Sequence, residues 1–118
     1  MARPTLTPAL RAAVADRFKV LAEPARLEIL ETLRSGEQTV SEIVERTGLG
    51  QGNVSKHLQL LFTHGFVARR KEGLNVFYVL ADPAIFHLCY IMCDRVRENA
   101  RAAAIARLAA ATAHSPRR

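Results

Sequence analysis

Amide, hydroxyl and basic side chains follow one another between Gln51 and Lys71, and this stretch contains no carboxylate. In DNA recognition, asparagine and glutamine suit adenine edges, lysine suits guanine, and serine suits several acceptors or a phosphate. A carboxylate on such a surface would repel phosphates, so its absence favours contact with DNA. The candidates for base recognition are Gln51, Asn53, Ser55, Lys56 and Gln59.

Three basic residues, Arg69, Arg70 and Lys71, end this stretch. We expect them to reach backbone phosphates or a minor groove, where they supply salt-dependent affinity rather than sequence choice. Gly50 and Gly52 let the backbone come close to a duplex, and the amino end of a helix favours an anion. Any one polar residue could equally lie on a solvated helix face, and it is the ordered set that favours nucleic acid.

The only two cysteines, Cys89 and Cys93, are four residues apart and share one face of a predicted helix. Such a pair can hold a thiophilic ion such as As(III), Cd(II) or Cu(I) with help from another group. It can also be oxidised or bridged by a polysulfide, whereas a direct disulfide across one helical turn has poor geometry. Structural packing is the alternative, because cysteine is a common small buried hydrophobe.

Positioning the polar stretch requires elements with a buried side. Apolar residues recur at helical spacing in 39–47 and 51–62, and a glycine-containing turn joins these segments. Two extended segments, 66–71 and 74–80, follow with a glycine turn between them. Two short helices followed by a basic hairpin are typical of a winged helix-turn-helix. We therefore predict a helix-turn-helix over 39–63 and a wing over 66–80.

Helices are also predicted on both sides of this motif. Residues 8–21 carry the apolar stripe Leu10, Val14, Phe18 and Leu21, a second helix covers 24–33, and a long alanine-rich helix covers 83–112. The predicted fold is mainly α with a β-hairpin wing: four helices, two strands and a final helix in a single domain over 1–118. Apolar stripes on the two terminal helices predict a homodimer, because so short a chain would struggle to cover them.

Composition limits the function classes. The chain has 118 residues, and 17 Lys and Arg against 11 Asp and Glu give a net charge of +6. Residues 23–48 are acidic, with six Glu against three Arg, so the positive charge flanks them. No run of 18 apolar residues and no apolar signal core are present, which predicts a cytoplasmic location with reduced thiols and no membrane partner. The sequence contains no Ser-His-Asp order, no phosphate-binding glycine loop and no metal-ligand motif, so no motif in it indicates an enzyme.

Five segments of the chain resemble the ArsR/SmtB family of winged-helix repressors. They are FKVLAEPARLEIL (18–30), NVSKHLQLL (53–61), HGFV (64–67), RRKEG (69–73) and VFYVL (76–80). The resemblance covers roughly residues 10–95 and implies a dimeric repressor that an inducer releases from a palindromic operator. The terminal helices would form the dimer interface. His57, also a candidate DNA-binding residue, is similar to the family's recognition-helix histidine, for which packing or a phosphate contact is preferred over base recognition.

The usual metal sites of this family are absent. The third-helix site uses a Cys-x-Cys cluster, but residues 42–45 contain no thiol. At the last-helix site Asp82 and Glu98 match, whereas Ala84 and Arg95 replace the two histidines. A four-ligand tetrahedral site cannot form there, which leaves Cys89 and Cys93 as the possible sensing thiols. The alternatives are a non-specific architectural DNA-binding protein or a repressor of this family with no bound inducer.

Overall fold

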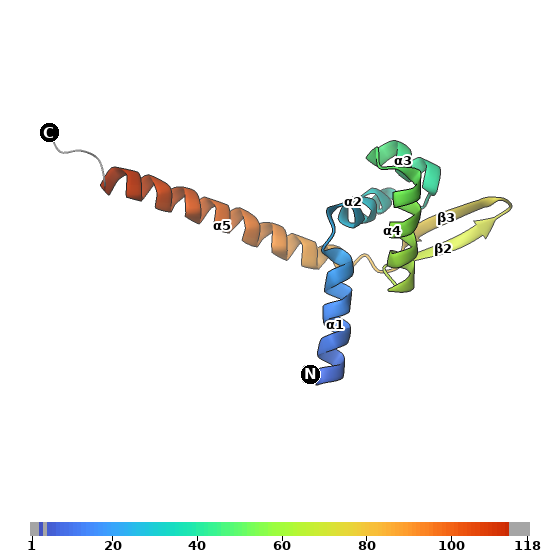
Figure 1. Cartoon of the computed structure of the whole chain (residues 1–118), viewed down its shortest axis with the longest axis horizontal. Helices are drawn as coiled ribbons and strands as arrows, with labels where there is room; N and C mark the ends of the chain where they lie inside the picture. The colour runs from blue at the N-terminus through green and yellow to red at the C-terminus, as the bar shows by residue number, and fades with distance from the viewer. Residues whose placement is uncertain (1–2, 4, 114–118) are drawn as a thin grey trace. The chain divides into compact units, whose positions relative to one another are not determined.

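The computed structural model describes residue 3 and residues 5–113. The chain forms two compact units, residues 1–83 and residues 84–118. Figure 1 shows the helices and strands of each unit. The two ends of the predicted domain, residues 1–2 and 114–118, lie outside the described residues, and a single domain over 1–118 stays a prediction.

Two helices begin the first unit, and each starts with a proline, whose fixed φ suits the first helical turn. Helix α1 runs from Pro8 to Leu21, the span that the sequence predicts, and the Thr7 hydroxyl caps it by accepting from the Leu10 amide at 3.2 Å. Helix α2 covers Pro24–Thr32 and continues into a 3₁₀ turn, η1, over Leu33–Ser35. The two together span the predicted second helix.

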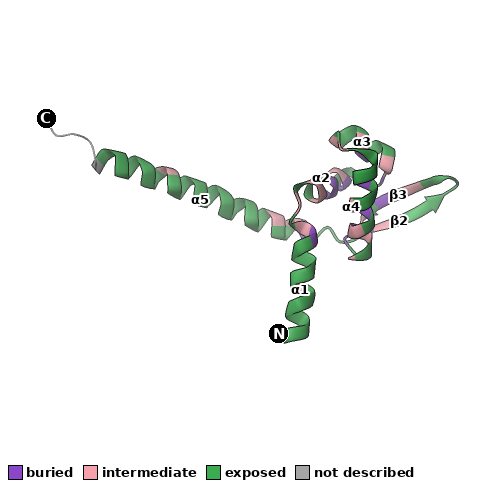
Figure 2. Cartoon of the chain, viewed as in Figure 1, coloured by how far each residue is buried: buried purple, intermediate pink, exposed green. Residues whose placement is uncertain are grey.

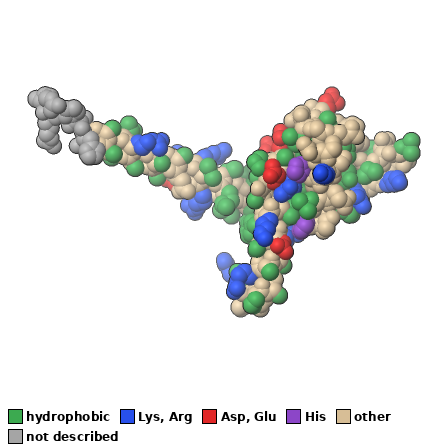
Figure 3. All heavy atoms as spheres, viewed as in Figure 1, with side chains coloured by type: hydrophobic (Ala, Val, Ile, Leu, Met, Phe, Trp, Pro, Cys, Tyr) green, Lys and Arg blue, Asp and Glu red, His purple; other side chains and the backbone are tan. Residues whose placement is uncertain are grey.

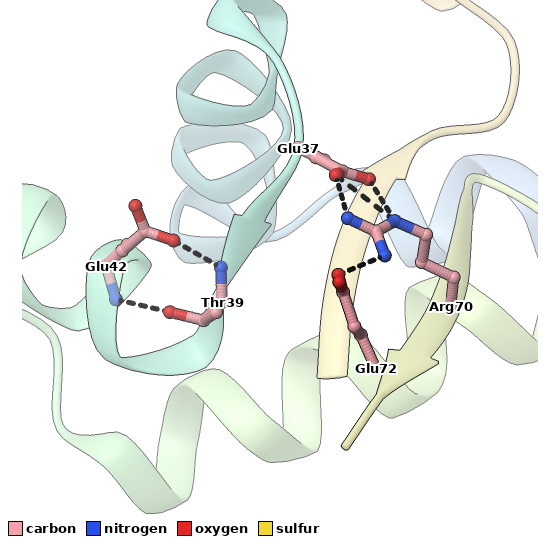
Figure 4. Close-up of polar contacts among 5 residues, drawn as sticks. All are labelled: Glu37, Thr39, Glu42, Arg70 and Glu72. Carbon is pink, nitrogen blue, oxygen red and sulfur yellow. Dashed lines mark hydrogen bonds and ion pairs between the residues drawn. The ribbon is translucent and has the colours of Figure 1, made fainter. Parts of the chain in front are cut away.

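Helix α3 covers Val40–Thr47 and begins with a reciprocal cap. The Glu42 amide donates to the Thr39 hydroxyl at 3.2 Å, and the Thr39 amide donates to the Glu42 carboxylate at 2.9 Å (Figure 4). This capping box satisfies two amides that a helix start leaves without partners. Gly48 ends α3 in the left-handed region at φ 73°, which a residue with a side chain rarely adopts.

Helix α4 covers Gln51–Thr63 and follows α3 after a three-residue turn. The predicted apolar stripe of α4, Val54, Leu58 and Leu61, is fully buried. The helix-turn-helix is therefore confirmed, with α4 as its second helix.

The sheet has three strands, where the sequence predicted two. Strands β2 (Val67–Glu72) and β3 (Asn75–Leu80) form the predicted hairpin, and β1 (Gln38–Thr39) pairs with the other edge of β3. The order is β1-β3-β2, with both pairs antiparallel. A two-residue strand that leads directly into a helix has no alternation to reveal it, which explains why the prediction was wrong here.

The core of the first unit lies between α2, α3, α4 and the sheet (Figure 2). Its most deeply buried side chains are Ile29, Leu30, Leu33, Ile43, Val54, Leu58 and Leu61. Helix α1 adds only Val20 to the buried set, and its predicted stripe stays largely open, with Leu10 37% and Phe18 51% exposed.

The second unit contains helix α5, Ile85–Ala113, with 29 residues. At 1.5 Å per residue the helix is about 43 Å long. Its exposed apolar side chains are Leu88, Tyr90, Ile91, Met92, Val96, Ile105 and Leu108. None of the described helices is both long and apolar enough to cross a membrane.

Candidate DNA-binding surface

One side of α4 is packed and the other is open. The buried residues Val54, Leu58 and Leu61 hold the helix against the core. The five residues predicted to recognise bases are all exposed: Gln51, Asn53, Ser55, Lys56 and Gln59. A rigid helix with a polar, carboxylate-free open side is what insertion into a major groove requires.

The wing has two faces, which the strand register separates. In the antiparallel pair β2–β3, Arg69 lies opposite Tyr78 and Lys71 lies opposite Val76. Tyr78 is buried, so Arg69 and Lys71 extend the face of the wing that packs toward the core. Arg70 lies opposite Phe77 and points to the other face. Figure 3 shows basic side chains on the wing.

Arg69 lies against the last turns of α4. Its guanidinium is 3.9 Å from the centroid of the Phe62 ring, and its Nη1 donates to the Gln59 side chain at 3.4 Å. A guanidinium over an aromatic face gains electrostatic attraction while its other donors stay available. These contacts join the wing to the open side of α4.

Arg70 is held by two carboxylates (Figure 4). Its Nε donates to both Glu37 oxygens at 2.9 and 3.1 Å, its Nη1 donates to Glu72 at 2.7 Å, and the group stacks 4.5 Å from the Phe77 centroid. The hydrogen bond from Arg70 lowers the pKa of Glu37 below its usual 4.5, and the same bond raises the pKa of Arg70. The three predicted phosphate-binding residues are thus divided between the two faces.

His57 is half-buried, unlike the open residues around it on α4. Its Nδ1 lies 3.2 Å from Nη1 of Arg26, a residue in the first turn of α2. The structure therefore places His57 at the contact between α4 and α2, beside the predicted recognition residues.

Sequence reasoning missed three residues that shape this surface: Arg26, Glu37 and Phe62. Arg26 lies within segment 18–30, which resembles the family, but the resemblance alone gave Arg26 no role of its own. Glu37 is 33 residues before its partner Arg70, and no local pattern signals so distant a pair. Phe62 lies at the end of α4, where its ring stacks against the Arg69 guanidinium.

The cysteines lie on α5, one turn apart. Cys89 is half-buried, Cys93 is exposed, and neither is in a disulfide. Within the described part of the chain, no group of three or more histidine, cysteine or acidic side chains could hold a metal ion. Any ion bound by this pair would need a further ligand from elsewhere or would bind through two sulfurs.

Comparison with protein families and curated proteins gives consistent results. The family model described as bacterial regulatory protein, arsR family, matches residues 23–69. A probable mercury resistance operon repressor of Streptomyces lividans is 36% identical over 85 residues, which are 72% of this chain and 68% of the relative. The transcriptional repressor SmtB of Mycobacterium tuberculosis is 36% identical over 84 residues, 71% of this chain. The chain spans only 60% of the length of that second relative.

Solved structures share the fold. A homodimeric winged helix-turn-helix DNA-binding domain from Mycobacterium bovis, described as a possible ArsR-family regulator, superposes with a TM-score of 0.70. It is 34% identical, and the match covers 84% of this chain and 95% of that one. HlyU from Vibrio cholerae has a TM-score of 0.63 at 31% identity, over 73% of this chain and 94% of its own.

Proposed function

The chain belongs to the ArsR/SmtB family of bacterial transcriptional repressors, and from that premise we propose that it binds a palindromic operator as a homodimer. Recognition helix α4 enters the major groove, and the wing contacts the flanking backbone. The relatives are repressors rather than enzymes.

The observation that carries this proposal is the open side of α4. Its five polar residues stand on a helix whose other side is fully buried, so their positions are fixed by the core. Lysine and amide side chains there suit guanine and adenine edges. Arg69 and Lys71 extend the same surface onto the wing and supply phosphate contacts.

Exposed apolar side chains support the homodimer. On α1, Leu10 is 37% and Phe18 is 51% exposed, and on α5, Met92 is 63% and Val96 is 66% exposed. Apolar stripes of this kind on a small regulator are typical of interfaces. The M. bovis relative is described as homodimeric. A two-fold dimer would place its two recognition helices about 34–36 Å apart, on half-sites one helical turn apart.

For the inducer, we propose a thiophilic metal or metalloid ion, or reactive sulfur or oxidant, acting at Cys89 and Cys93. The two sulfurs are one helical turn apart, and exposed Cys93 is accessible to a reagent. Soft thiolates select soft ions, and the S. lividans relative is described as a mercury resistance operon repressor. Hg(II) is therefore a probe to set beside As(III), Cd(II) and Cu(I).

Two measurements test these proposals. Fluorescence anisotropy with a duplex chosen by the protein from a random library compares wild type with Asn53→Ala and Lys56→Ala. Each substitution is expected to weaken binding by about 5- to 150-fold and to relax selection at one base pair. The control is Glu45→Gln on α3, which leaves base selection unchanged.

The thiol proposal is tested with Cys89→Ser, Cys93→Ser and the double variant. Each ion and a polysulfide are added to the preformed complex, and release of DNA is followed. We expect wild type to release and the double variant to stay bound. Release of the double variant at the wild-type concentration would exclude thiol sensing and leave operator binding untouched.

A further inference from the structure

Arg26 joins three helices in the first unit. It lies in the first turn of α2, and its Nε donates to the Val20 carbonyl of α1 at 2.5 Å. Its Nη2 donates to the Lys19 carbonyl at 3.4 Å, and its Nη1 lies 3.2 Å from Nδ1 of His57 on α4. One half-buried guanidinium therefore contacts the end of α1 and the middle of α4.

The contact at α1 has an evident physical role. Lys19 and Val20 belong to the last turn of α1, where carbonyls lack partners within the helix and the helix dipole is negative. The Lys19 carbonyl also accepts from the Ala22 amide at 3.2 Å, so the main contribution of Arg26 is to give the Val20 carbonyl a donor and to connect the end of α1 to α2.

The contact at α4 fixes the chemistry of His57. A guanidinium has donors and no acceptor, so Nδ1 of His57 must accept the hydrogen bond. With Nδ1 engaged by Arg26, His57 lies between the buried stripe of α4 and the open side, and it cannot turn freely toward a base.

We propose that Arg26 and His57 act together as a positioning pair, which holds recognition helix α4 in the orientation that operator binding needs and links it to α1. This inference rests on the proposed function, because it assigns how that function is positioned. His57 acts through Arg26 and does not itself recognise a base or bind a phosphate. Arg26 touches no DNA.

Three readouts separate positioning from direct contact. A positioning pair supports binding to the specific site, where α4 must fit the groove, and matters little for non-specific binding, which depends on charge. A variant that lacks one of these two residues loses no phosphate contact, so the slope of log affinity against log salt stays at the wild-type value. Because the two residues act through one hydrogen bond, the second substitution adds little to the first.

The experiment uses the full chain and a duplex selected by wild type. Arg26→Gln, His57→Leu and the double variant are compared, with His57→Asn as the conservative variant that keeps an acceptor near the position of Nδ1. Lys19→Gln is the charge-matched control, because it removes a neighbouring cation and leaves the Lys19 carbonyl in place. Thermal unfolding of every variant identifies loss of folding, and His57→Leu leaves the cap on α1 intact.

We expect His57→Leu to weaken specific binding by about tenfold, the loss of its one hydrogen bond to the Arg26 guanidinium, and Arg26→Gln, which also loses the α1 contacts, to weaken it at least as much. The double variant binds as weakly as Arg26→Gln alone, His57→Asn recovers part of the loss of His57→Leu, and non-specific affinity and the salt slope stay at wild-type values. Additive losses in the double variant would refute the coupling of Arg26 with His57. A salt slope reduced by about 0.9 per protomer would also refute the positioning role and would indicate a phosphate contact. Failure of wild type to select any sequence would instead refute the proposed function.

Discussion

The division of the wing into two faces predicts that its neighbouring cations contribute unequally to DNA binding. Lys71 is exposed and makes no ion pair within the described residues, whereas Arg70 is held by Glu37 and Glu72. The substitutions Lys71→Gln and Arg70→Gln each remove one positive charge at adjacent positions of β2. A model based on charge alone predicts the same effect for both.

The expected magnitude follows from counterion release. Each lost phosphate contact lowers the slope of log affinity against log salt by about 0.9, so a dimer that loses two contacts loses about 1.8. Between roughly 50 and 200 mM salt, the wild-type loss of affinity exceeds that of Lys71→Gln by about 12-fold. For Arg70→Gln we expect less than half of this change in slope, because its charge is already met by two carboxylates.

Fluorescence anisotropy on one selected duplex, repeated at five salt concentrations, measures these slopes. Lys19→Gln, a matched substitution on α1, is the control and should keep the wild-type slope. An Arg70→Gln variant that lowers the slope as much as Lys71→Gln does, or a Lys71→Gln variant with an unchanged slope, would refute an unequal contribution of the two cations.

Three further predictions concern the supporting contacts. Arg70→Gln should raise the pKa of Glu37 toward 4.5 in an NMR titration, and an unchanged pKa would contradict the Arg70–Glu37 contact. Because the pKa of Glu37 is lowered in the folded state, the contact stabilises the fold above pH 4.5, and this stabilisation is lost as the pH falls through the folded-state pKa. Thr39→Ala removes the cap of α3 and should lower the free energy of unfolding by about 0.5–2 kcal/mol in urea titrations. Ser41→Ala, two residues later in the first turn of α3, should change it little. Phe18→Glu on the open stripe of α1 should shift dimer to monomer in sedimentation velocity with folding retained; an unchanged dimer would place the interface elsewhere.

Local patterns were sufficient for the helices and the hairpin. The apolar stripe of α4 and the glycine turns around it are short-range signals, and they correctly indicated which side of α4 is open. The predicted alternation in 74–80 became β3, with a buried Tyr78.

Long-range pairings could not be predicted in the same way. The partners Glu37 and Arg70 are 33 residues apart, and Arg26 and His57 are 31 apart. Each pair exists only because the core brings separate elements together, and β1 pairs with β3 for the same reason. The basic triplet 69–71 therefore looked uniform in sequence, whereas the register of β2 and its carboxylate neighbours make its members unequal.

The central claim is that α4 and the wing of a homodimer recognise one palindromic sequence. The direct test is selection of binding sites by the full chain from a random duplex library, followed by footprinting of the enriched duplex. We predict an inverted repeat whose half-site centres lie about 10–10.5 base pairs apart, protected symmetrically. Enrichment of no sequence, or equal affinity for the selected and unselected duplexes, would contradict the account and favour a non-specific architectural DNA-binding protein.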